Sequence, residues 1–170
     1  MSQVRVYWDA NAFLGYLQDE TVLDDAGRKR ADSCEEVLNA HDAPTGELKI
    51  VTSAFTITEV LNTQGNKRIP RKPENRAQVV KLFEERKFTL LNVEEFLAWE
   101  AFNLVWDHNI DPKDAIHVAS AIRMKVDEMH TYDAGLLRLN GVLPMDGAKK
   151  LKIRNPRVAQ QDLPGVKDKP

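Results

Sequence analysis

Short apolar segments alternate along the chain with longer segments of helical periodicity, and this order restricts the possible folds more than any other feature. The apolar segments cover residues 4–8, 48–52, 88–93 and 128–131. Between them, apolar side chains recur every three or four residues, which is the spacing of one helix face. Parallel strands need crossover connections, which are usually helices. We therefore predict an α/β domain of three layers, with a central, mainly parallel β-sheet flanked by helices.

Seven helical segments complete this prediction. One starts after Ser53, and the others cover residues 10–18, 24–40, 74–85, 94–106, 111–126 and 134–139. Ser53 and Asp111 are of the residue types that cap helix N-termini, and Pro112 suits a first helical position, so we predict both as N-caps. We expect the domain to span residues 1–150 and the basic, polar segment 151–170 to be a flexible tail.

Size and composition favour a single cytoplasmic domain that makes no contact with a membrane. The 170 residues are enough for one hydrophobic core. No apolar run approaches the roughly 20 residues of a membrane-spanning helix, and the N-terminus lacks the features of a signal peptide. Cys34 is the single cysteine, so no internal disulfide can form. We expect Cys34 to be a partly buried thiol without a catalytic role.

Four acidic residues are predicted to gather at one edge of the sheet. Asp9 and Asp133 each follow a predicted strand, and Glu59 and Asp114 lie near the starts of helices that begin at the same edge. Ligands of such sheets bind outside the carboxyl ends of the strands. Four carboxylates would repel one another unless a divalent cation lay between them. Oxygen ligands suit Mg²⁺ or Mn²⁺, and such a site can hydrolyse a phosphodiester.

Four short segments of the chain form an ordered set of motifs: Tyr7-Trp8-Asp9-Ala10-Asn11, Ser53 to Val60, Asp111 to Ala121, and Thr131-Tyr132-Asp133. In these segments and their order the chain resembles PIN domains, and most of all the toxin component of prokaryotic toxin–antitoxin pairs. The resemblance covers roughly residues 4–140. The resemblance implies a PIN-like fold and a metal-dependent endoribonuclease with an RNA substrate and an antitoxin partner. It also implies that four acids bind the metal and carry catalysis, namely Asp9, Glu59, Asp114 and Asp133.

Two further residues are implied to support that site. Asn11 stands where PIN domains often have a small polar residue, and Thr131 stands where a hydroxyl commonly braces the last acid. We expect them to act as a second shell around the ligands.

For Asp114 the alternative is a capping role at the start of its helix. We expect His117 to be a structural residue, with a role as a proton carrier as the alternative.

A basic segment follows the second predicted strand and helix. Residues 64–76 contain five basic residues and one acidic residue, although the whole chain has a formal net charge of −2. Basic groups near a catalytic edge are what RNA phosphates require. We predict that Lys67, Arg68, Arg71 and Lys72 contact the substrate, with a solvated loop as the alternative interpretation.

Aromatic residues suggest packing surfaces rather than base-stacking sites. We expect Trp8, Trp99 and Trp106 to lie in the core. A homodimer is also expected, and the helix face that contains Phe96, Leu97 and Phe102 is a candidate interface.

Two other functions remain open from the sequence. One is a phosphohydrolase of an acid-cluster class, which would need a second Asp two residues after Asp9, where the chain has Asn11. The other is a non-catalytic RNA-binding or partner-binding module that kept the PIN-like fold. The presence of all four acids favours catalysis over both.

Overall fold

The computed structural model describes residues 3–61 and 69–158, and its centre is a five-stranded, wholly parallel sheet. The strand order is β3-β2-β1-β4-β5. The strands are β1 (Val4–Trp8), β2 (Leu48–Ser53), β3 (Thr89–Leu91), β4 (Glu128–His130) and β5 (Ile153–Arg154). The predicted parallel sheet is therefore confirmed, and the four predicted strands end within two residues of their expected bounds.

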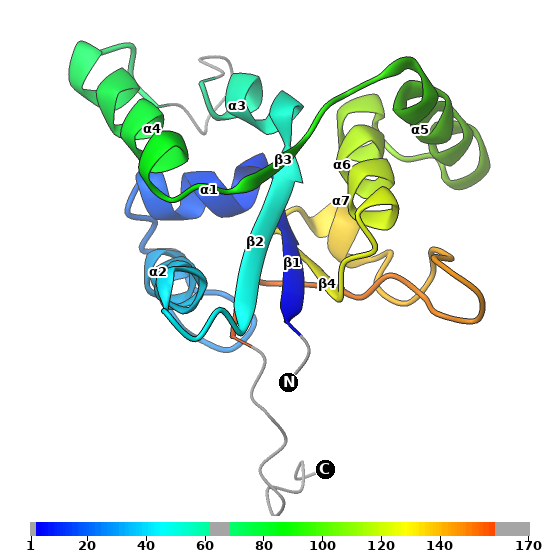
Figure 1. The fold of residues 1–170 in the computed structure, drawn as a ribbon, viewed down its shortest axis with the longest axis horizontal. Coiled ribbons are helices and arrows are strands. Elements are labelled where there is room, and N and C mark those ends of the chain that lie inside the picture. The colour runs from blue at the N-terminus through cyan, green and yellow to red at the C-terminus, as the bar shows by residue number, and fades with distance from the viewer. Residues whose placement is uncertain (1–2, 62–68, 159–170) are drawn as a thin grey trace, which may run out of the picture.

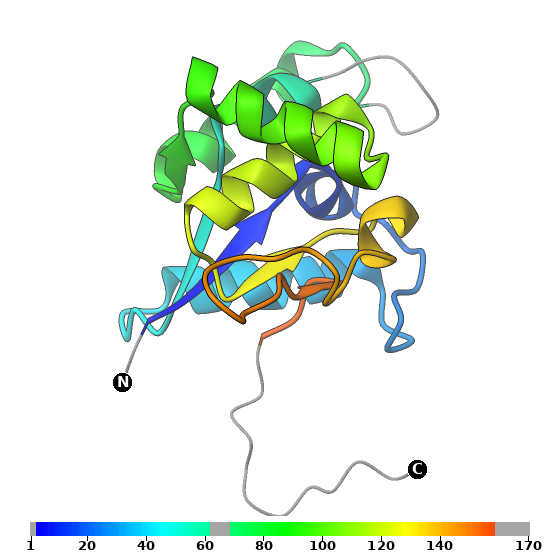
Figure 2. The ribbon, with the colours of Figure 1, turned by 90° about the vertical axis from the view of Figure 1, so that its right-hand side faces the viewer.

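Helices cover both faces of this sheet and complete a three-layer α/β domain, as predicted (Figure 1). On one face lie α1 (Ala10–Leu17), α2 (Arg30–Asp42) and α4 (Pro73–Glu85). On the other lie α5 (Glu95–His108), α6 (Pro112–Arg123) and α7 (Ala134–Leu137), with α5 packed outside α6 (Figure 2). The short helix α3 (Ala54–Val60) continues from the end of β2.

Strand β1 shows how the sequence divides the core into two parts. Val6 and Trp8 point into the cluster under α1, α2 and α4, and Tyr7 points into the cluster under α5 and α6. This follows from the two-residue period of a strand. Trp8 is fully buried against Phe13, with ring centroids 5.1 Å apart, so its predicted core position is confirmed.

The core positions predicted for Trp99 and Trp106 are wrong. Their exposed fractions are 59% and 81%. Helix α5 buries Leu97 and Ala101, which lie one turn apart, and these two residues define its inner face. Residues 99 and 106 project from the opposite side, so the apolar residues around them in the sequence did not indicate which face of the helix is buried.

The predicted N-caps of α3 and α6 are confirmed. The Ser53 hydroxyl accepts a hydrogen bond from the Phe55 N–H, and the Asp111 carboxylate accepts one from the Lys113 N–H. The predicted start of α2 at residue 24 is wrong, because the helix starts at Arg30. The Asp24 carboxylate instead accepts the N–H groups of Ala26 and Arg28 and closes a turn.

The structure extends the folded domain past residue 150. Leu151 and Ile153 are buried, and β5 pairs in parallel with β4. The buried Glu128 in β4 binds Lys152 at 2.7 Å and also pairs with Arg154. Residues 151–158 of the predicted tail therefore pack against the domain, and residues 159–170 lie outside the described part of the chain. Within residues 3–61 and 69–158, no helix has the length and apolar character to cross a membrane.

Candidate functional site

The candidate site lies at the carboxyl edge of the two central strands. Trp8 and His130 are register partners at the ends of β1 and β4, so the residues that follow them lie side by side. Asp9 follows β1, and Thr131 and Asp133 follow β4. The pairing of these strands therefore brings together residues that lie far apart in the sequence.

Asp9 is a buried carboxylate with both oxygens in hydrogen bonds. One oxygen accepts the Ala12 N–H at 3.0 Å and caps α1, and the other accepts the hydroxyl of Thr131. Burial raises the pKa of Asp9 above its ordinary value. The negative charge of Asp133 raises this pKa further, whereas His117 and the Thr131 hydroxyl lower it.

Thr131 links two of the acids through one hydroxyl group. It donates to Asp9, and its oxygen accepts the backbone N–H of Asp133 at 2.9 Å. The Asp133 carboxylate accepts the Leu136 N–H at 2.9 Å and caps α7. Thr131 is fully buried, so its rotamer is fixed by packing as well as by these bonds. The orientation of Asp9 and the backbone at Asp133 are thus set by the same side chain.

Asp114 is a second acid whose protonation the site perturbs. Burial raises its pKa to about 7, and the charges of Asp133, Asp9 and Asp111 add to this effect. The capping bond of α6 belongs to Asp111, so the fold does not need Asp114 as a cap. The mutual influence of the charges shows that Asp9, Asp114 and Asp133 share one region.

Glu59 is presented by a helix, α3, and not by the end of a strand. It lies near the end of α3, and one carboxylate oxygen is paired with Nε2 of His117 on α6. His117 is buried, and its Nδ1 lies 2.8 Å from the hydroxyl of Tyr7. Sequence reasoning treated His117 as structural, although its position three residues after Asp114 places it near that acid on the helix.

The donor chemistry of the site fits a hard divalent cation. Three aspartates provide only oxygen ligands, which Mg²⁺ and Mn²⁺ prefer, and their mutual repulsion is what a cation would relieve. Within the described residues, however, no three histidine, cysteine or acidic side chains already stand in a metal-holding arrangement. Glu59 contacts His117 in this structure, and Asn11, in the first turn of α1, is half-buried two residues after Asp9.

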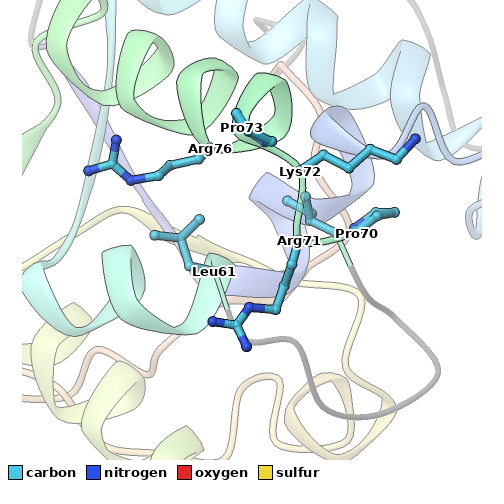
Figure 3. Close-up of a pocket in the computed structure, with 7 residues that line it drawn as sticks. Leu61, Pro70, Arg71, Lys72, Pro73 and Arg76 are labelled. Atoms are coloured by element: carbon cyan, nitrogen blue, oxygen red, sulfur yellow. The ribbon is translucent and has the colours of Figure 1, made fainter.

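A cleft of about 450 Å³ contains two of the predicted substrate-binding residues (Figure 3). It is formed where the chain leaves α3 and enters α4, and its lining combines apolar and basic side chains: Leu61, Ile69, Pro70, Arg71, Lys72, Pro73 and Arg76. Leu61 is the residue after α3, two positions from Glu59, so the cleft adjoins the helix that presents this acid. Lys67 and Arg68 lie outside the described residues.

Comparisons with known proteins agree with this architecture. Two solved structures share the fold with TM-scores of 0.54. The first is VapC20 of Mycobacterium tuberculosis, a toxin that cleaves the sarcin–ricin loop, at 13% identity over 76% of this chain and 90% of that one. The second is a toxin–antitoxin complex from Klebsiella pneumoniae, at 17% identity over 86% of this chain and 99% of that one.

The sequence itself identifies the family. No curated protein gives a significant match to the chain. The family model of the PIN domain matches residues 6–142, which contain all four predicted acids. The chain therefore belongs to the PIN domain family.

Proposed function

We propose that the protein is a divalent-metal-dependent endoribonuclease, the toxin of a toxin–antitoxin pair, that acts in the cytoplasm. The observation that carries this proposal is the gathering of Asp9, Asp114 and Asp133, where the other acids help to raise the pKa of Asp114 to about 7. A fold that keeps three repelling carboxylates at its ligand-binding edge loses stability unless a cation binds there.

Each acid has a distinct part in the proposed site. Asp9, Asp114 and Asp133 hold Mg²⁺ or Mn²⁺, and Glu59 approaches from α3 as the fourth ligand. A bound cation would neutralise phosphate charge and make water more acidic. The Thr131 hydroxyl fixes the orientation of Asp9, and the Asp133 carboxylate caps the start of α7. Asn11 completes the second shell from α1.

The basic cleft provides the proposed route for RNA. Arg71 and Lys72 lie beside the end of α3, and no acidic side chain of the described residues forms an ion pair with either. They would bind backbone phosphates on one side of the acids, together with Lys67 and Arg68. The apolar lining of the cleft suits an unstacked base of single-stranded RNA.

Two protein partners belong to the proposal. An antitoxin would inhibit the enzyme by placing a basic side chain among the acids, and the Klebsiella pneumoniae structure is a toxin–antitoxin complex of the same fold. A second copy of the chain would cover the outer face of α5, which exposes four large aromatic side chains: Phe96, Trp99, Phe102 and Trp106.

The alternative functions are less well supported. A phosphohydrolase with an aspartyl nucleophile would need a second aspartate two residues after Asp9, where the chain has Asn11. A non-catalytic binding module would gain nothing from the repulsion that raises the pKa of Asp114.

The test compares the wild type with Asp114→Asn on structured and single-stranded RNAs, with Mn²⁺, Mg²⁺ or EDTA. We expect cleavage by the wild type alone and only with a metal. Cleavage by both proteins would place the activity elsewhere. If neither protein cleaves, calorimetry with Mn²⁺ decides, because a binding module has no reason to bind Mn²⁺ through Asp114.

A further inference from the structure

A chain of three buried or half-buried side chains connects the core of the sheet to the candidate site. Tyr7 is fully buried in β1, and its hydroxyl lies 2.8 Å from Nδ1 of His117. Nε2 of His117 contacts one carboxylate oxygen of Glu59, whose side chain is 16% exposed. Because the carboxylate of Glu59 can only accept, Nε2 must carry the proton in this contact. In the neutral ring Nδ1 is then the acceptor, and Tyr7 donates to it.

The packing around the His117 ring fixes its orientation. The Tyr7 ring lies edge-on to it, with centroids 5.9 Å apart, and the Phe55 ring lies 5.8 Å away. The exposed fraction of His117 is only 2%. Glu59 itself belongs to a helix of seven residues near the surface, and its side chain would have several rotamers without a partner. The rigid member of the pair is therefore His117.

We propose that the Tyr7–His117 pair positions Glu59 for metal binding, an inference that rests on the proposed function. His117 occupies one oxygen of Glu59, and within the described residues no hydrogen bond involves the second oxygen. Metal-binding carboxylates are commonly held in this way by a hydrogen bond to one oxygen, and loss of the partner typically weakens metal binding by 10–100-fold. His117 is thus a positioning residue that acts through Glu59.

Two amide substitutions of His117 test the roles of its two ring nitrogens one at a time. In H117Q the amide nitrogen is separated from Cβ by the same number of bonds as Nε2 is in His117. In H117N the amide nitrogen is separated from Cβ by the same number of bonds as Nδ1. Mn²⁺ binding is measured by calorimetry for the wild type, H117N and H117Q. We expect about tenfold weaker binding for H117N and a change of less than about threefold for H117Q. Equal affinities of wild type and H117N would overturn the proposal.

Further variants distinguish positioning from packing. F55L removes an aromatic neighbour of His117 without changing a polar contact, and we expect it to bind Mn²⁺ like the wild type. Y7F keeps the His117 ring and removes its hydrogen-bond partner at Nδ1, so we expect weaker binding in the same direction as H117N. This variant decides the question if H117N does not fold. A loss in F55L as large as that in H117N would show that packing, and not positioning, sets the affinity.

A double variant tests whether His117 acts through Glu59. In the background of Glu59→Ala, H117N should cause no additional loss of Mn²⁺ affinity. An additional loss of about tenfold would overturn the proposed route. If the proposed function fails, the wild type itself binds no Mn²⁺ and both proposals fall. If only the positioning role fails, the wild type still binds Mn²⁺ and substitutions of His117 do not change its affinity.

Discussion

At the scale of single residues, the site depends on a hydroxyl that serves two acids. Thr131 donates to Asp9 and accepts from the N–H of Asp133, and its hydroxyl is sheltered from water. A buried polar group that loses its partner costs roughly 1–3 kcal/mol of stability. The family resemblance indicated that Thr131 would support the last acid. That it also holds Asp9 follows from the register of β1 and β4, which the sequence alone does not contain.

We expect Thr131→Val to lower the free energy of unfolding of the metal-free protein by about 1–3 kcal/mol. Val keeps the shape of the side chain but neither bond. Thr131→Ser keeps the hydroxyl and should lose less than about 1 kcal/mol. Urea unfolding at about pH 8 with EDTA measures both values. Equal losses in the two variants would mean that packing of the methyl group, and not the hydroxyl, is what the site requires.

Asp114 provides a second test at this scale. Its pKa is about 7 in the folded protein and near 3.8 when unfolded, so the folded state favours the protonated form. Stability is therefore lost as the pH rises from about 4 to 7, and the full penalty remains above about pH 7. Asp114→Asn removes this penalty. Because Asp114 is only half-buried, we expect the variant to be about 1–2 kcal/mol more stable at about pH 8, and less so at about pH 5.

The measurement is urea unfolding of both proteins with EDTA at the two pH values. Asp111→Asn is the comparison variant, because it removes a neighbouring exposed charge that contributes to the raised pKa of Asp114 and retains a capping side chain. We expect a smaller gain in stability for it than for Asp114→Asn. A variant less stable than the wild type at the higher pH would show that the charge of Asp114 is compensated in the folded protein.

At the scale of elements, the sequence predicted helix starts better than helix faces. A cap is a local interaction, so Ser53 and Asp111 could be identified from their neighbours. The turn at Asp24 follows the same local chemistry but was missed, because the polar residues after it also suit a helix. The inner face of α5 is set by its contact with α6, and apolar residues occur on both sides of the helix. Periodicity therefore could not show that Trp99 and Trp106 lie outside.

The outer face of α5 carries a prediction about assembly. Phe102 is exposed, and its ring packs edge-on against Trp99, with centroids 5.6 Å apart. If a second copy covers this face, Phe102→Glu should convert the dimer to a monomer, because it buries a charge without a partner. The fold should be retained, since substitutions at exposed positions change stability by about 0.5 kcal/mol.

Analytical ultracentrifugation of the wild type, Phe102→Glu and Gln78→Glu measures the outcome. Gln78 is exposed on α4, which covers the other face of the sheet, so Gln78→Glu adds the same charge away from the aromatic group. A wild type that is monomeric at every concentration, or a Phe102→Glu variant that remains dimeric, would rule out this face as the interface.

At the scale of the whole molecule, the order of strands and helices was sufficient to predict which edge of the sheet carries the acids. Parallel strands place their carboxyl ends at one edge, so the order of elements already brings Asp9 and Asp133 to the same side of the domain. Strand β5 was missed because it has two residues and follows a loop, although Leu151 and Ile153 show the alternation of a strand. The contacts of His117 with Tyr7 and Glu59 are long-range, and no local pattern specifies them.

The proposed cation would join four parts of the chain that lie far apart in the sequence. Its ligands come from the end of β1, from α3, from α6 and from the start of α7. A ligand that binds only the folded state raises stability according to its concentration relative to its dissociation constant. We therefore expect Mn²⁺ to raise the melting temperature of the wild type and to leave that of Asp114→Asn nearly unchanged.

The size of this stabilisation should depend on pH in a direction that the acids determine. Burial raises the pKa of Asp9, and the pKa of Asp114 is raised to about 7, so protons compete with the cation at lower pH. We expect the shift in melting temperature with Mn²⁺ to be larger at about pH 7.5 than at about pH 5.5. Ca²⁺, an oxygen-binding cation of larger size, serves as the comparison. A shift independent of pH would place the Mn²⁺ at groups other than these acids, because a cation bound by carboxylates with raised pKa values must displace their protons as the pH falls.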